Sequence, residues 1–236
     1  MKTNLGKKIT GCSMKKGMLL FVLFGLLLVS GPLAQEAIAN PGSQADELID
    51  AGNAKVKAGK HSEAIEIFTR ALSLDGGVAN QATAYFKRGQ AYFELGKFDF
   101  AISDYSAALK DLEGMKTLND FKSEYFYNSG RAYDKTGNLK QAVSDYTSAL
   151  ELLPDHLKAR NNRAVAYYKL KEFRLAVADC DKYLAHDTKW ASIYYTRGAA
   201  KIGLKDKSAI PDLIKAAKMG NGYAQDALRK AGVKWQ

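Results

Sequence analysis

The chain has 236 residues, with 35 lysines and arginines against 25 aspartates and glutamates, a net charge of +10 and two cysteines. A hydrophobic fraction of 47% and a charged fraction of 25% exclude a disordered chain. Two cysteines exclude a disulfide framework and a cysteine-rich zinc site. The length accommodates one folded domain or two small ones.

The first 39 residues have the pattern of a secretory signal peptide. Residues 1–17 contain five lysines and no acidic residue, and residues 18–34 are apolar and uncharged. Small side chains at Ala37 and Ala39 suit signal peptidase and predict cleavage after Ala39. The alternative is an uncleaved membrane anchor, because residues 18–34 approach the shortest run that spans a bilayer. We therefore expect an exported protein, periplasmic or secreted, or in the alternative a membrane-anchored protein that faces the periplasm.

Residues 40–236 repeat one pattern five times. A small residue marks the same point of each unit, at Gly52, Gly89, Gly130, Ala164 and Gly198. Successive marks lie 37, 41, 34 and 34 residues apart, so the period is 34, with inserts near residues 76–81 and 113–120. Each unit contains two amphipathic helical patterns of about 12–14 residues, joined by a short turn near Gly59, Gly96 or Gly137. The expected repeats are about 45–78, 82–115, 123–156, 157–190 and 191–222.

The segment GRAYDKTGNLKQAVSDYTSALELLP, residues 130–154, resembles the tetratricopeptide repeat family in the spacing of its small, aromatic and proline positions. The resemblance covers nearly all of residues 40–236. It implies an all-α domain, a right-handed superhelical α-solenoid of about five helix pairs. The last stretch, from Ala216 to Gly232, is similar to the end of Sel1-like repeats, and a helix at about 223–232 would cap the open end of the stack.

The core of each pair is predicted from volume. Small residues lie where two helices cross closely, and Phe68, Tyr105 and Tyr146 fill the space beside them. In the fourth unit Cys180 takes the aromatic position, and Tyr183 takes the small position three residues later. We interpret this as a volume exchange within one core layer, which predicts a buried cysteine that acts as a small apolar side chain.

No pattern in the sequence indicates catalysis. The sequence contains no glycine-rich phosphate loop, no G-x-S-x-G and no H-E-x-x-H. His61, His156 and His186 belong to different units and lie near turns, where we expect them to be exposed. The sequence therefore predicts no enzyme, no catalytic residue, no cofactor and no metal site.

The resemblance implies that the first helix of each unit lines a concave groove. Aromatic side chains recur there with amides and charges between them, which suits a protein or peptide partner, because rings give contact area and amides bond a ligand backbone. The predicted contacts are Asn53, Phe86, Gln90, Phe93, Tyr127, Arg131, Asn161, Tyr168 and Tyr195. In the alternative, some of these rings pack against the neighbouring unit and never meet a ligand.

A more specific partner is not expected. Related co-chaperone domains hold a C-terminal carboxylate with a set of lysine, asparagine and arginine side chains. Asn53 and Asn162 match two of these positions, but Ile49, Ser192 and Thr196 occupy others. Because that set is incomplete, the resemblance does not imply a chaperone-type carboxylate partner.

Charge is uneven along the repeats. Residues 40–156 carry 13 basic and 17 acidic side chains, a net −4, whereas residues 157–236 carry 17 basic and 7 acidic, a net +10. This asymmetry favours an acidic partner or an anionic envelope surface, with solubility alone as the alternative. Nucleic acid is not expected, since no recognition motif is present. The leading hypothesis is a non-catalytic exported scaffold, and the alternative is an anchored surface tether that uses the basic repeats.

Overall fold

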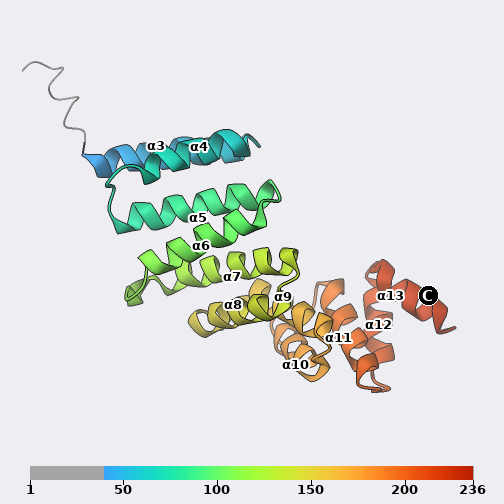
Figure 1. The fold of residues 1–236 in the computed structure, drawn as a ribbon. Helices are drawn as coiled ribbons and strands as arrows, with labels where there is room; N and C mark the ends of the chain where they lie inside the picture. Colours follow the sequence, from blue (N-terminus) through green and yellow to red (C-terminus); the bar gives the residue numbers. More distant parts are fainter. Residues whose placement is uncertain (1–39, 236) are drawn as a thin grey trace, which may run out of the picture. The chain divides into compact units, whose positions relative to one another are not determined.

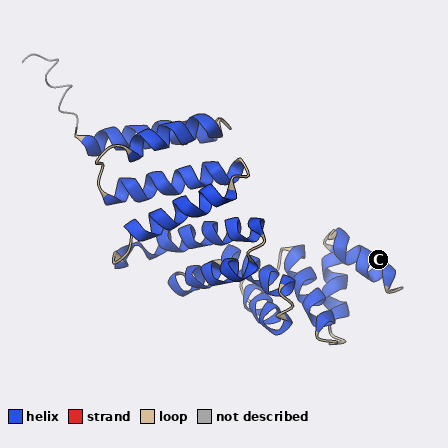
Figure 2. Ribbon diagram, viewed as in Figure 1, coloured by secondary structure: helices blue, strands red, loops and turns tan. Residues whose placement is uncertain are grey.

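The computed structural model describes residues 40–235, and residues 41–235 belong to one compact unit. The predicted signal peptide, residues 1–39, lies outside the described residues. The described chain is helical throughout and contains no strand (Figures 1 and 2). None of these described helices is long and apolar enough to cross a membrane.

Five antiparallel helix pairs follow one another, and a single helix closes the series (Figure 1). The pairs are α3 (Pro41–Lys57) with α4 (His61–Leu72), α5 (Val78–Glu94) with α6 (Phe98–Asp111), α7 (Asn119–Thr136) with α8 (Leu139–Leu152), α9 (Leu157–Lys169) with α10 (Phe173–Leu184), and α11 (Ala191–Gly203) with α12 (Ala209–Lys218). A short 3₁₀ turn, η1 (Lys116–Leu118), precedes α7, and α13 (Gly222–Lys230) packs on α12. The predicted all-α solenoid is confirmed.

The turn inside each pair needs a left-handed residue. Gly59, Gly96 and Gly137 supply it in the first three pairs with φ near +70 to +80°, at no steric cost. Lys171 and Lys205 take the same conformation in the fourth and fifth pairs, with φ of 62° and 60°. A lysine disfavours this left-handed conformation, so the packing of the helices on either side must impose it on Lys171 and Lys205.

The first helices meet one another across the units. α3 contacts α5, α5 contacts α7, α7 contacts α9 and α9 contacts α11, whereas no comparable contact joins the second helices of the described pairs. We call the side of the stack formed by α3, α5, α7, α9 and α11 the inner face. Side chains from adjacent units therefore converge on this face and separate on the opposite one.

A small residue faces an aromatic ring where the two helices of a pair cross. A Cβ added to Gly130 would lie 2.7 Å from Tyr146 Cε1, and one added to Gly89 would lie 2.8 Å from Tyr105 Cε1. In the fourth unit Cys180 is fully buried, and it shares a core cluster with Ala164, Tyr183 and Ile193. The predicted volume exchange is confirmed.

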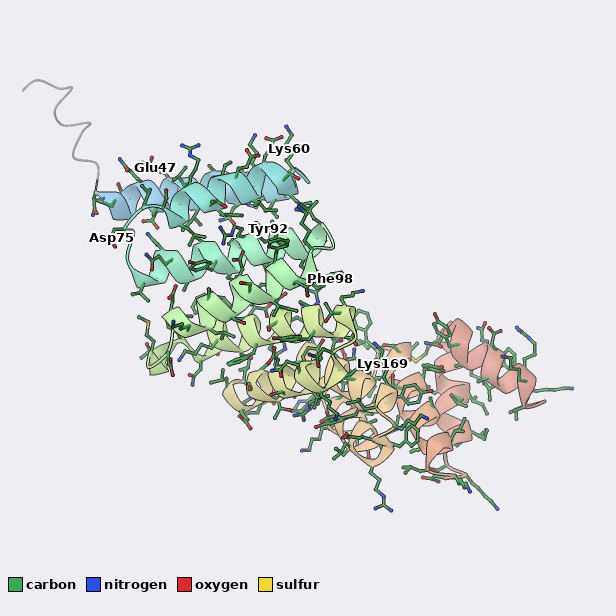
Figure 3. The ribbon with its side chains drawn as sticks, viewed as in Figure 1. Glu47, Lys60, Asp75, Tyr92, Phe98 and Lys169 are labelled. Carbon is green, nitrogen blue, oxygen red and sulfur yellow. The ribbon has the colours of Figure 1, made fainter. Side chains whose placement is uncertain are left out.

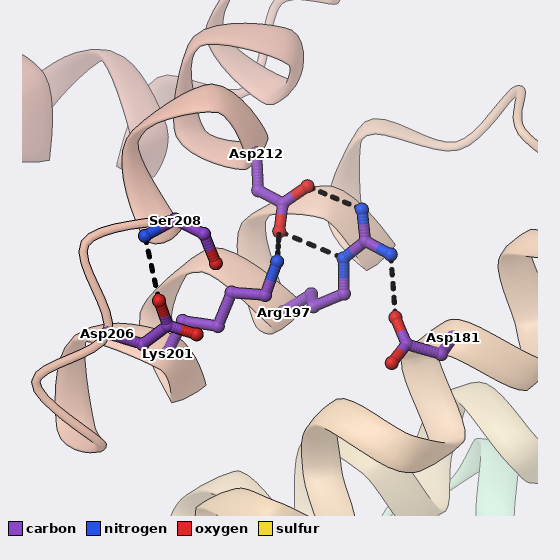
Figure 4. Close-up of polar contacts among 6 residues, drawn as sticks. All are labelled: Asp181, Arg197, Lys201, Asp206, Ser208 and Asp212. Atoms are coloured by element: carbon purple, nitrogen blue, oxygen red, sulfur yellow. Dashed lines mark hydrogen bonds and ion pairs between the residues drawn. The ribbon is translucent and has the colours of Figure 1, made fainter.

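Half-buried arginines of the first helices join the units to one another. In three units an arginine of the first helix forms a two-point ion pair with an aspartate of its own second helix and also bonds a side chain of the preceding unit. These arginine bridges are Arg88 with Asp104 and Thr69, Arg163 with Asp179 and Thr147, and Arg197 with Asp212 and Asp181. Figure 4 shows the last of them, in which Lys201 Nζ also lies 2.8 Å from Asp212 Oδ2.

The third unit lacks its arginine bridge. Ser129 takes the arginine position, and Asp145 takes the aspartate position with a residue exposure of 7%. Burial raises the pKa of the Asp145 carboxyl, and the hydrogen bonds from Ser129 and Gln141 lower it by less. The joint between the second and third units therefore forms without an arginine–aspartate ion pair of this kind.

We expect Gly130→Ala to destabilise the chain by about 1–3 kcal/mol, because the new Cβ meets the buried Tyr146 ring, which has no room to withdraw. Urea denaturation measures the change. Gly222→Ala is the matched control, because nothing lies within 4 Å of its added Cβ; it should change stability by less than about 0.5 kcal/mol. Equal urea midpoints for Gly130→Ala and the parent would contradict the close packing described for this crossing.

We expect Arg88→Met to destabilise the chain by about 3 kcal/mol, because it leaves the buried Asp104 carboxylate without its cation. Arg229→Met removes an exposed ion pair with Asp226 and should cost less than about 0.5 kcal/mol. Thermal unfolding by circular dichroism compares the two variants. Equal losses would show that the arginine bridge contributes no more than a surface pair.

Candidate functional site

The predicted contact residues lie on the first helices, and eight of the nine are half-buried, as expected for side chains at the edge of a groove. These eight are Asn53, Gln90, Phe93, Tyr127, Arg131, Asn161, Tyr168 and Tyr195. Half-burial fixes a side chain against its neighbours while leaving part of it free to meet a partner. The ninth residue, Phe86, differs.

Phe86 belongs to the core. Its residue exposure is 6%, and its ring stacks on Tyr125 with centroids 4.0 Å apart and packs against Tyr105 at 5.7 Å. Tyr125 comes from α7 of the next unit, so the ring of Phe86 seals the joint between two units. The prediction that Phe86 contacts a ligand is therefore wrong. Its ring packs against the neighbouring unit, which was the alternative, and no ring face remains for a ligand.

A first hollow of about 300 Å³ lies on the inner face and is lined by residues of the first three units. We call it the N-terminal hollow. It brings together three of the predicted residues, Gln90, Phe93 and Arg131. Its full lining is Val56, His61, Gln90, Phe93, Glu94, Tyr105, Asn128 and Arg131.

A second hollow of about 420 Å³ lies between the third, fourth and fifth units. We call it the central hollow. It brings together two predicted residues, Tyr127 and Asn161, and adds Trp190, which is 61% exposed and donates its indole N–H to Asp187 at 3.0 Å. Its full lining is Tyr127, Leu157, Lys158, Asn161, Asn162, Tyr183, Asp187, Trp190 and Ser192.

Arg131 lies between residues of the two hollows. Its guanidinium carbon is 4.4 Å from the centroid of the Phe93 ring and 5.7 Å from that of Tyr127. One of its N–H groups donates to Asn128 Oδ1 at 3.1 Å. The cation is thus held by two rings and an amide, and it forms no ion pair with a carboxylate of residues 40–235.

His156 is built into the inner face. Its position near a turn predicted an exposed side chain, but the side chain is only 9% exposed, because it caps α9. The Ala159 N–H donates to His156 Nδ1, so the ring proton of the neutral tautomer lies on Nε2, 3.3 Å from Glu124 Oε2. Burial would raise the pKa of Glu124, but hydrogen bonds from His156 and Asn128 outweigh it and lower that pKa. His61 is half-buried, and only His186 is exposed as expected.

The remaining predicted residues border neither hollow. Tyr168 packs against Phe173 with centroids 6.0 Å apart, and Tyr195 packs against Tyr223 at 5.8 Å. Asn53 is half-buried on α3. Lys169, labelled in Figure 3, lies at the end of α9. Its Nζ is 2.6 Å from Oδ1 of Asp134 in the third unit.

Two residues that line the hollows, Tyr105 and Trp190, were not among the predicted contacts. Tyr105 was assigned to the core alone, although its buried ring also reaches the N-terminal hollow. Trp190 lies in the connection before α11, outside the helical period that selected the other residues. Its only signal in the sequence is that a large apolar side chain occurs in a polar connection.

Neither a metal-binding cluster nor a reactive thiol occurs among the described residues. No group of three histidine, cysteine, aspartate or glutamate side chains within residues 40–235 is placed to hold a metal ion. Cys180 is fully buried, and burial raises the pKa of its thiol to about 12. The thiol is therefore neutral at physiological pH and is not a nucleophile.

Comparison with known proteins identifies the repeat. A family model described as tetratricopeptide repeat matches residues 49–114 and 127–190, together more than half of the chain. RNA polymerase II-associated protein 3 of Xenopus tropicalis is 38% identical over 72 residues, which cover 29% of this chain and 11% of that protein. The protein of the same name from Rattus norvegicus matches to the same extent. The chain thus spans about a tenth of the length of these curated relatives.

Solved structures show the same fold. The crystal structure of YrrB, described as a TPR protein with an unusual peptide-binding site, has a TM-score of 0.69 at 21% identity and covers 83% of this chain and 97% of YrrB. A crystal structure of MamA has a TM-score of 0.64 at 20% identity and covers 78% of this chain and 96% of MamA. At this level of identity the likeness concerns the fold alone.

We expect iodoacetamide at pH 8 to leave Cys180 unmodified in the folded chain and to modify it fully in urea. With a thiol pKa of about 12, only about one thiol in ten thousand is ionised at pH 8, and burial blocks access. Mass spectrometry of the proteolytic peptide that contains Cys180 measures the labelling. Rapid labelling of the folded chain would contradict the inert, structural role of this thiol.

Proposed function

Since the chain belongs to the tetratricopeptide repeat family, we propose that it is a non-catalytic exported adaptor that binds a peptide or partner protein along its inner face. Through that partner it helps to assemble or localise a complex of the cell envelope or of a secretion pathway. The proposal combines the family, whose repeats serve protein interactions, with the signal-peptide pattern of residues 1–39.

One observation carries the proposal: two hollows lie on the same face, and Arg131 lies beside Phe93 of one and Tyr127 of the other. An extended peptide presents side chains at regular intervals, and successive hollows suit such a ligand. Rings and amides that are already held by their neighbours lose little conformational entropy on binding, so less of the interaction free energy is spent on ordering them. The description of YrrB as a peptide-binding TPR protein is consistent with this use of the fold.

A second candidate function is an anchored surface tether. It is favoured by the net charge of +10 over residues 157–236, much of it on exposed lysines such as Lys205, Lys207 and Lys218. In this case residues 18–34 stay in the membrane and the basic repeats lie on an anionic surface. Exposed charges are screened within about 8 Å at physiological ionic strength, so binding to anionic vesicles should collapse at moderate salt. Groove binding through rings should persist.

We expect alanine at Phe93, Tyr127 and Tyr168 together to abolish capture of the partner from an envelope extract, because these rings supply contact area on the inner face. The full-length chain in mild detergent is the bait, and mass spectrometry identifies bound proteins. The matched control changes Phe100 and Leu175, exposed side chains of the second helices α6 and α10. Circular dichroism checks that all baits are folded.

A partner lost with the inner-face variant and kept by the control would support the adaptor. A partner kept by both variants would move the binding surface away from the inner face, and the surface tether would become the better explanation.

A further inference from the structure

The N-terminal hollow contains buried polar atoms that the fold itself does not use. Tyr105 and His61 line the hollow, and the buried atoms Tyr105 Oη and His61 Nδ1 have no hydrogen-bond partner within residues 40–235. The whole Tyr105 residue is fully buried. A buried hydroxyl without a partner destabilises the folded chain, so its presence here needs an explanation beyond packing.

The same hollow contains a cation whose charge is not neutralised. Arg131 contacts two rings and Asn128, whereas the arginines of the three arginine bridges each hold an aspartate. A guanidinium has five N–H donors, and only one hydrogen bond of Arg131 is made to the described chain. The remaining donors are available to an acceptor that enters the hollow.

The other groups of the hollow are compatible with an anionic acceptor. Burial raises the pKa of Tyr105, so its hydroxyl stays protonated and can donate. The Gln90 side chain is half-buried and adds an amide donor. Glu94 is the one acidic residue of the lining, and it is exposed, so water screens its charge more than that of the half-buried Arg131.

The size and composition of the hollow select among acceptors. A volume of about 300 Å³ accepts a single side chain, and Val56 and Phe93 provide apolar walls for its methylene groups. A backbone carbonyl or a carboxamide would satisfy Tyr105 but leave the charge of Arg131 uncompensated. A carboxylate satisfies both, and bonds between a guanidinium and a carboxylate are among the stronger hydrogen bonds in proteins.

We infer that the N-terminal hollow is the subsite for an aspartate or glutamate side chain of the bound peptide, which Arg131 and Tyr105 hold by its carboxylate. This inference rests on the proposed function, because it assigns one position of the ligand that lies along the inner face. It predicts a partner segment with an acidic residue flanked by apolar ones.

The test begins with a random peptide library displayed on phage and selected on the full-length chain in mild detergent. Selected peptides that require Phe93, Tyr127 and Tyr168 are synthesised with a fluorophore, together with versions in which each acidic residue is changed to its amide. Fluorescence anisotropy gives their affinities. We expect one acidic position to be enriched, and its amide version to bind the parent chain at least about tenfold more weakly.

The variants Arg131→Gln and Tyr105→Phe test which side chains bind the carboxylate at this acidic position of the peptide. Arg131→Gln should bind the acidic peptide and its amide version equally, because the cation that distinguishes them is gone. Tyr105→Phe should weaken binding of the acidic peptide while raising the thermal stability of the free chain, since it removes a buried hydroxyl without a partner. A merely structural role for Tyr105 would not weaken binding in a more stable protein.

Tyr146→Phe is the matched control. Tyr146 occupies the equivalent position of the third unit, its ring is fully buried, its hydroxyl lies near the Asn162 side chain, and it borders neither hollow. Tyr146→Phe should leave the preference for the acidic peptide unchanged.

The outcomes separate this inference from the proposed function. Peptides that need the inner-face rings but show no acidic preference, or a preference that survives in Arg131→Gln, overturn the acidic subsite and leave the adaptor intact. Failure to select any peptide that needs those rings overturns peptide binding along the inner face and this inference with it.

Discussion

In four of the five pairs a small residue on the first helix faces a large side chain on the second, and the rest of the packing in the solenoid depends on this close crossing. At Gly130 the ring of Tyr146 occupies the place of a missing Cβ, and at Gly198 Leu213 does the same. Because the helices approach so closely, few side chains of either helix remain inside the pair. The rest point to the neighbouring unit, to the inner face or, like Phe100 and Leu175, to solvent, so the crossing limits which residues are left to build joints and hollows.

The joints between units use charge as well as packing. Each arginine bridge pairs a half-buried arginine with a buried aspartate. Removing such a carboxylate from water is costly, and the two-point contact to the arginine offsets that cost. The bond from Arg163 to Thr147 extends the contact to the preceding unit. The third unit departs from this arrangement, with Ser129 in place of the arginine. At the same joint the stacked rings of Phe86 and Tyr125 supply apolar contact instead. The N-terminal hollow borders this joint, lined by residues of both units.

Aromatic side chains on the first helices serve two competing purposes. Phe86 and Phe93 lie seven residues apart on α5, yet one is buried in a joint and the other lines a hollow beside a cation. A ring that closes a joint stabilises the stack, and a ring that borders a hollow offers contact area to a partner. The Tyr105 hydroxyl shows the same competition. It has no hydrogen-bond partner among residues 40–235, which lowers the stability of the free protein, and a ligand that bonds it would remove that loss.

The sequence by itself determined the helix pairs, the turns and the core layer, including the exchange of volume between Cys180 and Tyr183. These features depend on local period and side-chain size, which a single chain displays directly. It also selected the face on which Gln90, Phe93 and Arg131 meet. Only the tertiary structure decided that Phe86 is buried, that His156 caps a helix inside the inner face, and that Tyr105, His61 and Arg131 share one hollow. Those outcomes depend on how successive units rotate against each other, and that rotation is set by contacts between residues tens of positions apart, which no local pattern encodes.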